Sequence, residues 1–445
     1  MSSDEGEISS SPSQGARKRP RDSSPDSDEE EGALLDKPAA PVHPSQQISN
    51  SPYNDIAAAS PLTVADTPEP DYQGASASDR LNDRVFSGCS NMENYTSDIK
   101  IGEGTFGQVL KGKDKRTNQV VALKRILMHN EKEGMPITAL REIKILKALH
   151  HPNIVQLLEI AFKPGNRRLR ERGSIYMVFP YMDHDLSGLL ENKRVSLSPN
   201  HIKSYLQQLL RAVDYLHASN ILHRDMKSAN ILIDDTGHLR LADFGLARSF
   251  SPEEVDRDYT NCVITRWYRP PELLMGGTKY NNAVDYWGVG YHATFLTITR
   301  CVFAEMLKKK PVLTGSSDLD QLDKIFQLCG FPDDKYWPGW RGYPAFSDTV
   351  DKIKADYKRS VYDKFAACSR AEISLLEAFF QTNPSKRITP EEALLHDYFI
   401  KEKPRPAVPG TSDFPSFPSS HEYDSRKIRD RFGASSRPGN EQKRR

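Results

Sequence analysis

The chain has 445 residues, of which 61 are basic and 60 acidic, and this balance gives no support for direct DNA binding. Its five cysteines are scattered without a Cys-x-x-Cys pair, which argues against a disulfide framework and a cysteine-based zinc site. The amino terminus lacks the segments of a signal peptide and no run of about 18 apolar residues occurs, so we expect a soluble intracellular protein without a membrane span.

Residues 1–94 are rich in Ser, Pro, Asp and Glu, which predicts a disordered tail because too little apolar surface can be buried to offset ordering entropy. Within it, the basic run from Arg17 to Arg21 is typical of nuclear import signals and predicts a nuclear protein. A solvated run of charges is the alternative interpretation. Residues 400–445 predict a second, basic disordered tail.

A glycine-rich loop from Gly102 to Val109 follows the tail, in a region where short strands with turn residues between them are expected over 99–109 and 120–126. Its G-x-G-x-x-G-x-V spacing lets the backbone close over phosphates without a Cβ clash. The spacing alone also fits dinucleotide-binding folds, but there the glycines open a helix, whereas here they lie between strands. The expected ATP contacts of this loop are Ile101, Gly102, Glu103, Gly104, Thr105, Phe106, Gly107, Gln108 and Val109.

Lys124 lies on the second of these strands, 22 residues after Gly102. A lysine among apolar strand residues is ordinarily an outward-facing charge, but this position matches the lysine that contacts the α- and β-phosphates in the protein-kinase signature. A helix is expected to start near Pro136, with Leu140, Ile143 and Leu146 on its apolar face. Glu142 on this helix would pair with Lys124 and hold it against the nucleotide.

A longer helix is predicted over residues 199–217, with Ser198 as N-cap, after strands expected over 154–162 and 175–179. It leads into a loop in which Asp225 could accept the proton of an attacking hydroxyl. Lys227 could reach a phosphate in transfer, and Asn230 could hold a metal ion.

The loop from His223 to Asn230 differs from the protein-kinase pattern H-R-D-L-x-x-x-N only by Met226. Asp243 then opens an Asp-Phe-Gly motif, whose aspartate binds Mg²⁺ in kinases. The stretch from Pro136 to Glu142, Pro-Ile-Thr-Ala-Leu-Arg-Glu, resembles the cyclin-binding helix of cyclin-dependent kinases. The residues of this motif are similar to those of the catalytic subunit of positive transcription elongation factor b and its fungal relatives. The resemblance to this family covers residues 95 to about 400.

This resemblance implies an α+β, bilobal protein-kinase fold over residues 95–399. A small antiparallel-β lobe with one key helix would span 95–181, and a larger, mainly helical lobe 182–399. ATP and Mg²⁺ are the implied cofactors, with Met182 at the adenine hinge, Asp185 at the ribose, and Asn230 and Asp243 as metal ligands.

The resemblance also implies how the kinase is controlled. A cyclin would dock on the helix at Pro136 and turn Glu142 inward, so that the chain alone is largely inactive. An upstream kinase would phosphorylate Thr260, and the phosphate would meet three arginines. These are Arg141, Arg224 and Arg248.

Several further roles are implied downstream of Thr260. Thr265 would bridge Asp225 and Lys227, and Glu272 would pair with Arg387. The residues Val263, Ile264 and Arg269 resemble the platform that favours proline after the phosphorylated residue.

The implied function is proline-directed Ser/Thr phosphorylation of the heptad-repeat tail of RNA polymerase II and of elongation factors, promoting elongation and linked chromatin modification. A cell-cycle or splicing-linked cyclin-dependent kinase is the main alternative within the family. A scaffold without turnover and a nucleotide-binding module of another kind are alternatives from other classes.

Residues 291–300 depart from the family pattern by interrupting the expected central helix of the large lobe. Ten extra residues would rotate the downstream face by about 80° and shift it by about 15 Å, which a continuous helix with two buried faces cannot absorb. We therefore expect either a looped-out bulge or sequence that is absent from the mature message, and this segment is the main argument for the scaffold alternative.

Overall fold

The structure is a computed structural model. It describes residues 89–104, 107–128, 135–165, 173–192, 195–251, 253, 256–261, 263–290, 302–308, 315–354, 356–408, 421 and 423. The expectations for residues 1–88, for the basic run from Arg17 to Arg21 and for the segment 291–300 fall outside the described residues. No helix in the described ranges is long and apolar enough to cross a membrane.

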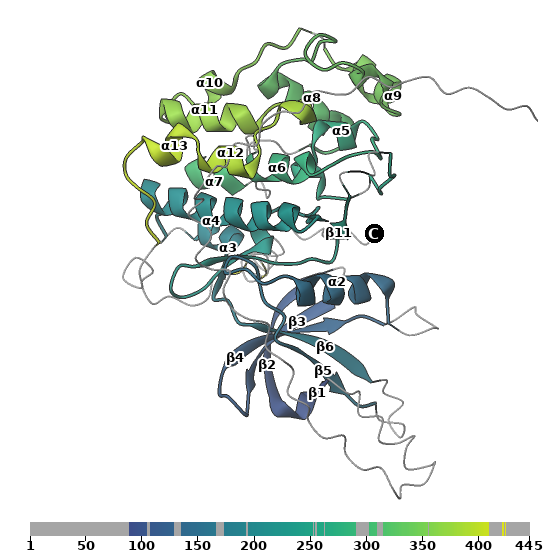
Figure 1. Cartoon of the computed structure of the whole chain (residues 1–445), viewed down its shortest axis with the longest axis vertical. Coiled ribbons are helices and arrows are strands. Elements are labelled where there is room, and N and C mark those ends of the chain that lie inside the picture. Colours follow the sequence, from purple (N-terminus) through teal and green to yellow (C-terminus); the bar gives the residue numbers. More distant parts are fainter. Residues whose placement is uncertain are drawn as a thin grey trace, which may run out of the picture. The chain divides into compact units, whose positions relative to one another are not determined.

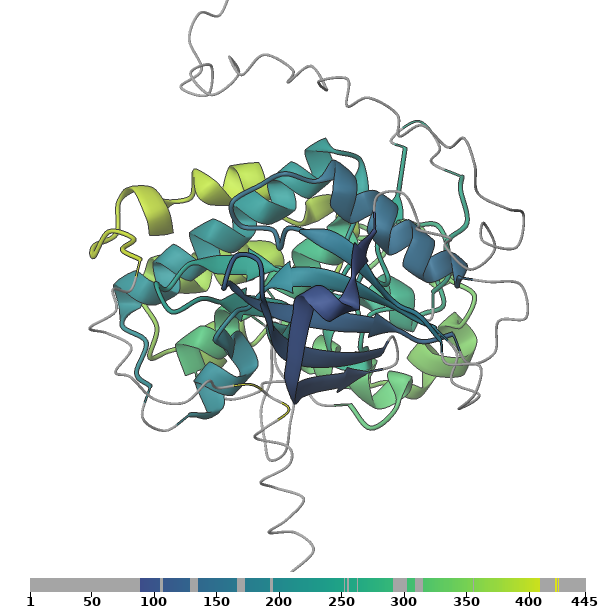
Figure 2. The same cartoon turned by 90° about the horizontal axis from the view of Figure 1, so that it is seen from below.

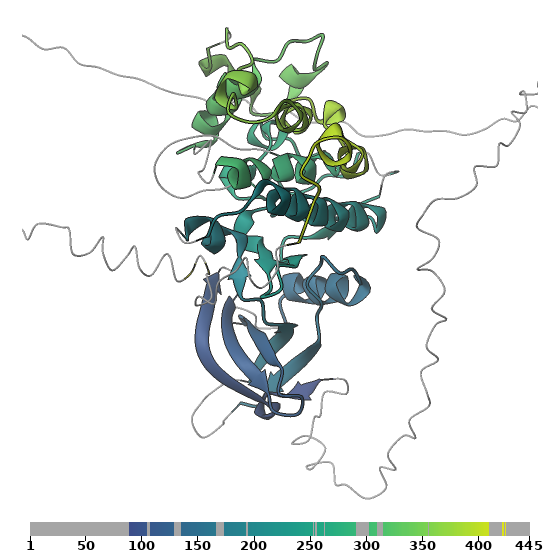
Figure 3. The same ribbon diagram turned by 90° about the vertical axis from the view of Figure 1, so that its left-hand side faces the viewer.

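A six-stranded sheet in the order β1-β5-β6-β4-β3-β2 forms the small lobe, and all neighbouring pairs are antiparallel except β1 with β5. Figure 3 shows how strongly these strands twist. The strands are β1 (Ser90–Asn91), β2 (Tyr95–Gly104), β3 (Gly107–Asp114), β4 (Val120–Ile126), β5 (Glu159–Lys163) and β6 (Ser174–Pro180). Gly102 and Gly104 lie at the end of β2 and Gly107 begins β3, so the glycines belong to a pair of strands and do not open a helix, as predicted. The single strand expected over 99–109 is divided between β2 and β3.

One strand starts later than predicted. Residues 154–158 do not join β5, because the backbone at Asn153 and Val155 is hydrogen-bonded to Leu241 of the larger lobe. Ile154 therefore makes a single isolated bridge with Leu241, and the strand begins at Glu159.

The helix of the small lobe, α2 (Ile137–Ala148), starts directly after Pro136 and lies beside the sheet (Figure 1). It buries Ala139, Glu142, Ile145 and Leu146, while Leu140 is 49% exposed. The predicted apolar face was therefore wrong at Leu140. The inward turn of Glu142 places positions three and four residues away from it on the buried side.

The larger lobe is mainly helical, and Figure 2 shows its helices behind the small-lobe sheet. Its helices are α3 (Leu186–Glu191), α4 (Pro199–Ala218), α5 (Pro271–Leu274), α6 (Ala283–Gly290), α7 (Val302–Lys308), α8 (Asp318–Cys329), α9 (Phe346–Thr349), α10 (Val361–Lys364), α11 (Arg370–Phe379), α12 (Pro390–Leu394) and α13 (Asp397–Ile400). Short strands complete it: β7 (His184–Asp185), β8 (Ile221–Leu222), β9 (Ile231–Ile233), β10 (Leu239–Leu241) and β11 (Arg248–Ser249).

The core of this lobe forms around α4, which confirms the helix predicted over 199–217. Its apolar residues recur at helical spacing and are fully buried; they include Tyr205, Leu206, Leu209, Leu210, Val213 and Leu216. The chain continues to pack after Phe399, because Lys203 of α4 donates to the Glu402 carbonyl and Arg405 donates to the Phe399 carbonyl.

Two helices flank the unusual segment 291–300. α6 and α7 contact each other and both contact α4, and Trp287 and Phe303 are fully buried. A Cβ on Gly290 would lie 2.1 Å from the Cβ of Phe379, so α6 ends in tight contact with α11. The described part of α6 ends at Gly290 and that of α7 begins at Val302. The residues between them fall outside the described residues, so the expected interruption of the helix stays a prediction.

Candidate active site

A cavity of about 300 Å³ lies beneath the glycine-rich hairpin. The predicted residues that line it are Ile101, Gly102, Glu103, Gly107, Val109, Lys124, Glu142, Met182, Asp185, Asn230 and Asp243. Gln108 is described but does not belong to its lining, and Thr105 and Phe106 fall outside the described residues. The apolar wall was not predicted residue by residue; it comes from Ala122, Leu146, Val155, Phe179, Leu232 and Ala242.

Lys124 is held between two carboxylates, as predicted for Glu142. Its Nζ donates to Glu142 at 2.7 Å and to Asp243 at 2.9 Å. Burial alone would lower the pKa of the Lys124 ammonium, but Asp243 and Glu142 outweigh it and raise that pKa above its ordinary value. Burial would likewise raise the pKa of Asp243, yet the ammonium lowers it to about 2. Lys124 and Asp243 therefore form a charged pair at neutral pH.

The inward position of Glu142 was expected only after a partner docks on α2. The structure of the single chain already has this position, with Glu142 only 3% exposed. The expected outward arrangement of the isolated chain is thus not the one seen.

The loop predicted to be catalytic converges on Asp225. Its Oδ2 accepts from Lys227 Nζ at 2.5 Å and from Asn230 Nδ2 at 3.0 Å. Asn230 also donates to the Asp225 backbone carbonyl at 2.8 Å, which directs its amide oxygen the other way. Thr265 reaches the second oxygen, Oδ1, at 3.4 Å. Thr265 and Lys227 therefore each contact Asp225, and it is Asp225 that connects them, whereas the resemblance implied that Thr265 contacts both.

Asp285 at the start of α6 fixes the backbone of this loop. Its carboxylate, fully buried, accepts from the backbone N–H groups of His223 and Arg224, each at 2.9 Å. His217 lies 2.9 Å from the same carboxylate. Arg224 has a φ of 63°, a left-handed conformation that costs energy for a residue with a side chain. Asp285 stabilises that conformation, and it was missed because nothing near it in the sequence marks the contact.

We expect acidic pH to lower the free energy of unfolding through protonation of the Asp285 carboxylate. Burial alone would raise the pKa of its carboxyl, but His217 and the backbone donors lower the pKa below the usual value of 3.8. Its stabilising effect is therefore complete above about pH 4 and is lost as the pH falls below that range. In urea unfolding we expect Asp285→Asn to be less stable than the native chain at pH 6, with a difference that narrows toward pH 3. A difference of equal size at both pH values would contradict this assignment.

The arginines predicted around Thr260 lie near one another. Burial and the neighbouring charges of Arg141 and Arg224 lower the pKa of Arg248, which is the effect of clustered cations. Thr260 is exposed, and its carbonyl accepts from the Tyr280 hydroxyl at 2.9 Å. That hydroxyl in turn accepts from Arg224 at 2.8 Å, so a residue missed by the sequence reasoning connects Thr260 to the cluster.

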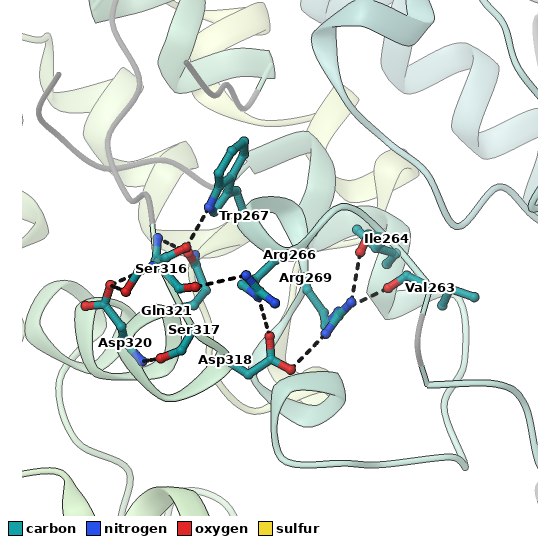
Figure 4. A network of polar contacts seen from close by, with 11 residues as sticks. Val263, Ile264, Arg266, Trp267, Arg269, Ser316, Ser317, Asp318, Asp320 and Gln321 are labelled. Atoms are coloured by element: carbon teal, nitrogen blue, oxygen red, sulfur yellow. Dashed lines mark hydrogen bonds and ion pairs between the residues drawn. The ribbon is translucent and has the colours of Figure 1, made fainter. Parts of the chain in front are cut away.

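The predicted proline platform has an unusual backbone. Ile264 has a φ of 65°, a strained conformation for a β-branched residue. Its carbonyl accepts from Arg269 Nη2 at 3.3 Å, and the Val263 carbonyl accepts from Arg269 Nε at 3.1 Å (Figure 4). Arg269 therefore holds both carbonyls on its own side.

The predicted pair of Glu272 and Arg387 is present and buried. The guanidinium donates to both carboxylate oxygens at 2.7 Å, and the two side chains are 3% and 0% exposed. The pair joins the end of the Thr260 segment to the region before α12. Neither residue lines the cavity, so the pair stabilises the segment without contacting the nucleotide site.

Two residues near the carboxy terminus, His421 and Tyr423, also line the cavity. His421 is 7% exposed; its ring lies 3.3 Å from the Tyr181 hydroxyl and 3.5 Å from Asp185. Neither was predicted, because the surrounding Ser/Pro-rich sequence has no hydrophobic periodicity that would mark a packed element.

Comparison with known proteins shows which proteins this chain is similar to. The chain is 48% identical over 359 residues to serine/threonine-protein kinase bur1 of Neurospora crassa, covering 78% of this chain and 61% of that relative. It is 46% identical over 362 residues to the probable cyclin-dependent kinase 9 of Schizosaccharomyces pombe, covering 79% and 59%. The chain thus spans about three fifths of the length of these curated relatives.

A solved structure is also similar, the crystal structure of the yeast RNA Pol II CTD kinase CTDK-1 complex. The TM-score is 0.62 at 39% identity, over 71% of this chain and 95% of that chain. These similarities confirm the predicted resemblance to a subgroup of cyclin-dependent kinases, here represented by bur1 and cyclin-dependent kinase 9. Residues 95–399, which carry the glycine-rich loop, the catalytic loop and the Asp-Phe-Gly motif, match the protein kinase domain, and the chain belongs to the protein kinase family.

Proposed function

We propose that this protein is a cyclin-dependent, proline-directed serine/threonine kinase that uses ATP and Mg²⁺. The observation that supports this most is the position of Asp225 beside Lys227, Asn230 and Thr265, next to a cavity that holds the Lys124–Asp243 pair. A scaffold without turnover would not need this arrangement.

The metal fits two of these residues. Asn230 donates its amide N–H groups to Asp225, so its amide oxygen is the atom that remains to bind a ligand. Asp243, whose pKa is about 2, contributes an ionised carboxylate close by, because the N–H of the preceding Ala242 donates to the Asn230 carbonyl at 2.8 Å. Mg²⁺ prefers such oxygen ligands and keeps the rest of its coordination for water and phosphate.

The transfer step follows from the positions of the charged groups. When bound, Mg-ATP supplies the γ-phosphoryl group and spreads its developing charge over the metal. Asp225 orients the substrate hydroxyl and accepts its proton as the new oxygen–phosphorus bond forms and the bond to the β-phosphate oxygen breaks. Lys227 offsets charge on the transferred group, and Lys124 anchors the α- and β-phosphates.

A cyclin is the proposed partner at α2. Ile137 is 71% and Leu140 is 49% exposed there, and exposed apolar side chains on one helix suit an apolar partner surface. Because Glu142 on the same helix holds Lys124, docking would stabilise the inward helix position. Phosphate on Thr260, added by an upstream kinase, would bring negative charge to Arg141, Arg224 and Arg248.

The substrate is a Ser or Thr followed by Pro. At the platform the Ile264 carbonyl is already bonded to Arg269, so a substrate backbone N–H in the following position would find no acceptor there. Proline has no such N–H and loses nothing. The heptad-repeat tail of RNA polymerase II and elongation factors, with repeated Ser-Pro, are the proposed substrates, in the nucleus and during elongation. The bur1-like relatives and the CTDK-1 complex support this over a cell-cycle or splicing role.

A pair of heptad peptides that differ only in Pro or Ala after the target serine tests this specificity. With the cyclin complex, we expect kcat/KM to be about tenfold or more higher for Ser-Pro, because an unsatisfied buried N–H costs about 1–3 kcal/mol. A peptide with alanine one position further on is the control and should match the parent peptide. Equal rates for Ser-Pro and Ser-Ala would contradict proline direction.

A further inference from the structure

Asp318, the first residue of α8, lies between Arg266 and Arg269, and Arg269 belongs to the proline platform (Figure 4). Its Oδ1 accepts from Arg266 Nε at 2.6 Å, and its Oδ2 accepts from Arg269 Nη1 at 3.1 Å. One carboxylate thus joins α8 to a turn more than 40 residues earlier in the chain.

Arg269 connects Asp318 to the backbone of Val263 and Ile264 in the platform. Its planar guanidinium has donors in fixed directions, and the side chain is only 14% exposed. One nitrogen faces Asp318, while the other two donate to the Val263 and Ile264 carbonyls. Without the carboxylate, a largely buried cation would retain only neutral acceptors and would lose the contact that fixes its plane.

We propose that Asp318 is a positioning residue for proline specificity. It holds Arg269 in the orientation that keeps the Ile264 carbonyl turned away from the substrate. The strained φ of 65° at Ile264 needs such support, because a β-branched residue relaxes readily to a negative φ. A relaxed carbonyl could accept the N–H of a residue other than proline. The inference rests on the proposed proline-directed function and names the residue behind it.

The surrounding contacts hold Asp318 in place. Trp267 Nε1 donates to the Gly315 carbonyl at 2.7 Å, and Arg266 Nη1 donates to the Ser316 carbonyl at 3.0 Å. The Ser317 side chain caps α8. The start of α8 is therefore anchored to the same turn by backbone contacts that do not involve the Asp318 carboxylate.

The chain offers a matched control in Asp320, two residues further along α8. Its carboxylate accepts from the Ser316 N–H at 2.7 Å and from Lys324 at 2.8 Å. Asp320→Asn removes a carboxylate from the same turn of the helix but leaves the guanidinium of Arg269 paired.

The test compares Asp318→Asn with Asp320→Asn and the native chain, each with its cyclin, on the Ser-Pro and Ser-Ala peptides. We expect Asp318→Asn to lower the kcat/KM ratio by about tenfold, equivalent to about 1.4 kcal/mol of discrimination, with the KM for ATP unchanged. Asp320→Asn should keep the native ratio. Asp318→Glu, which restores the charge, should recover part of it, and this variant also serves if Asp318→Asn is too unstable to purify.

The outcomes distinguish the positioning role of Asp318 from the proposed proline-directed function. If Asp318→Asn and the native chain discriminate equally, the positioning role is overturned even if the total activity falls, since that fall would reflect only a structural contribution. An equal loss of discrimination in Asp320→Asn would overturn it as well. If the native chain itself does not discriminate, the proposed proline-directed function fails before Asp318 is considered.

Discussion

Asp225→Asn is expected to lower kcat for peptide phosphorylation by about a hundredfold to ten-thousandfold, the range contributed by a positioned general base. The asparagine keeps the size of the side chain but cannot take the proton of the substrate hydroxyl. ATP should bind as before, because Asp225 is not among the residues that line the nucleotide cavity. Peptide phosphorylation by the cyclin complex and nucleotide binding by fluorescence measure the two effects separately.

An exposed carboxylate nearby supplies the control. Asp235 lies on the surface turn after β9, and Asp235→Asn should leave both kcat and ATP affinity unchanged. Comparable transfer by the Asp225→Asn and native complexes would remove the catalytic role assigned to Asp225. Loss of ATP binding in that variant would point to a collapsed site instead of a missing base.

Glu272→Gln is expected to lower the free energy of unfolding by about 3–5 kcal/mol, because it leaves a buried guanidinium without its carboxylate. Arg387 also donates to the carbonyls of Gln381 and Ala283, but these neutral acceptors do not balance its charge. Its guanidinium lies 4.7 Å from the ring of Trp287 at the centre of the larger lobe, so rearrangement is restricted. Urea unfolding of the chain measures this effect.

The exposed pair of Asp356 and Lys354 serves as the control. Its side chains are 65% and 70% exposed, and Asp356→Asn should leave the free energy of unfolding unchanged. In addition, Glu272→Gln combined with Arg387→Met should be less destabilising than the sum of the single changes, since the double variant leaves no unpaired charge. An unfolding midpoint for Glu272→Gln that equals the native one would show that the pair contributes little.

The residues that act in sequence-local motifs could be predicted from the sequence. Asp225, Lys227 and Asn230 lie within six residues of one another, so their spacing alone brings them together. Lys124 and Asp243 are 119 residues apart, but each lies in a motif with a known place in a kinase fold. The helix around α4 was predictable because its apolar residues repeat at helical spacing over five turns.

Contacts between residues that carry no motif could not be predicted. Asp285 and Asp318 each look like an ordinary first-turn carboxylate of a helix, and only the tertiary structure brings them to Arg224 and Arg269. The φ of 65° at Ile264 runs against the intrinsic preference of isoleucine and accompanies a tertiary hydrogen bond from Arg269. His421 reaches the cavity from a segment without periodicity. Leu140 was misplaced because the buried side of α2 is determined by the polar contact of Glu142.

Mass spectrometry of a heptad-repeat peptide incubated with the cyclin complex, ATP and Mg²⁺ tests the central claim most directly. We predict phosphate on serines that precede proline, with an initial rate lower by about a hundredfold or more when the complex carries Asp225→Asn. A native complex that binds ATP and cyclin yet leaves these serines unmodified would contradict the proposed enzyme and favour the scaffold alternative.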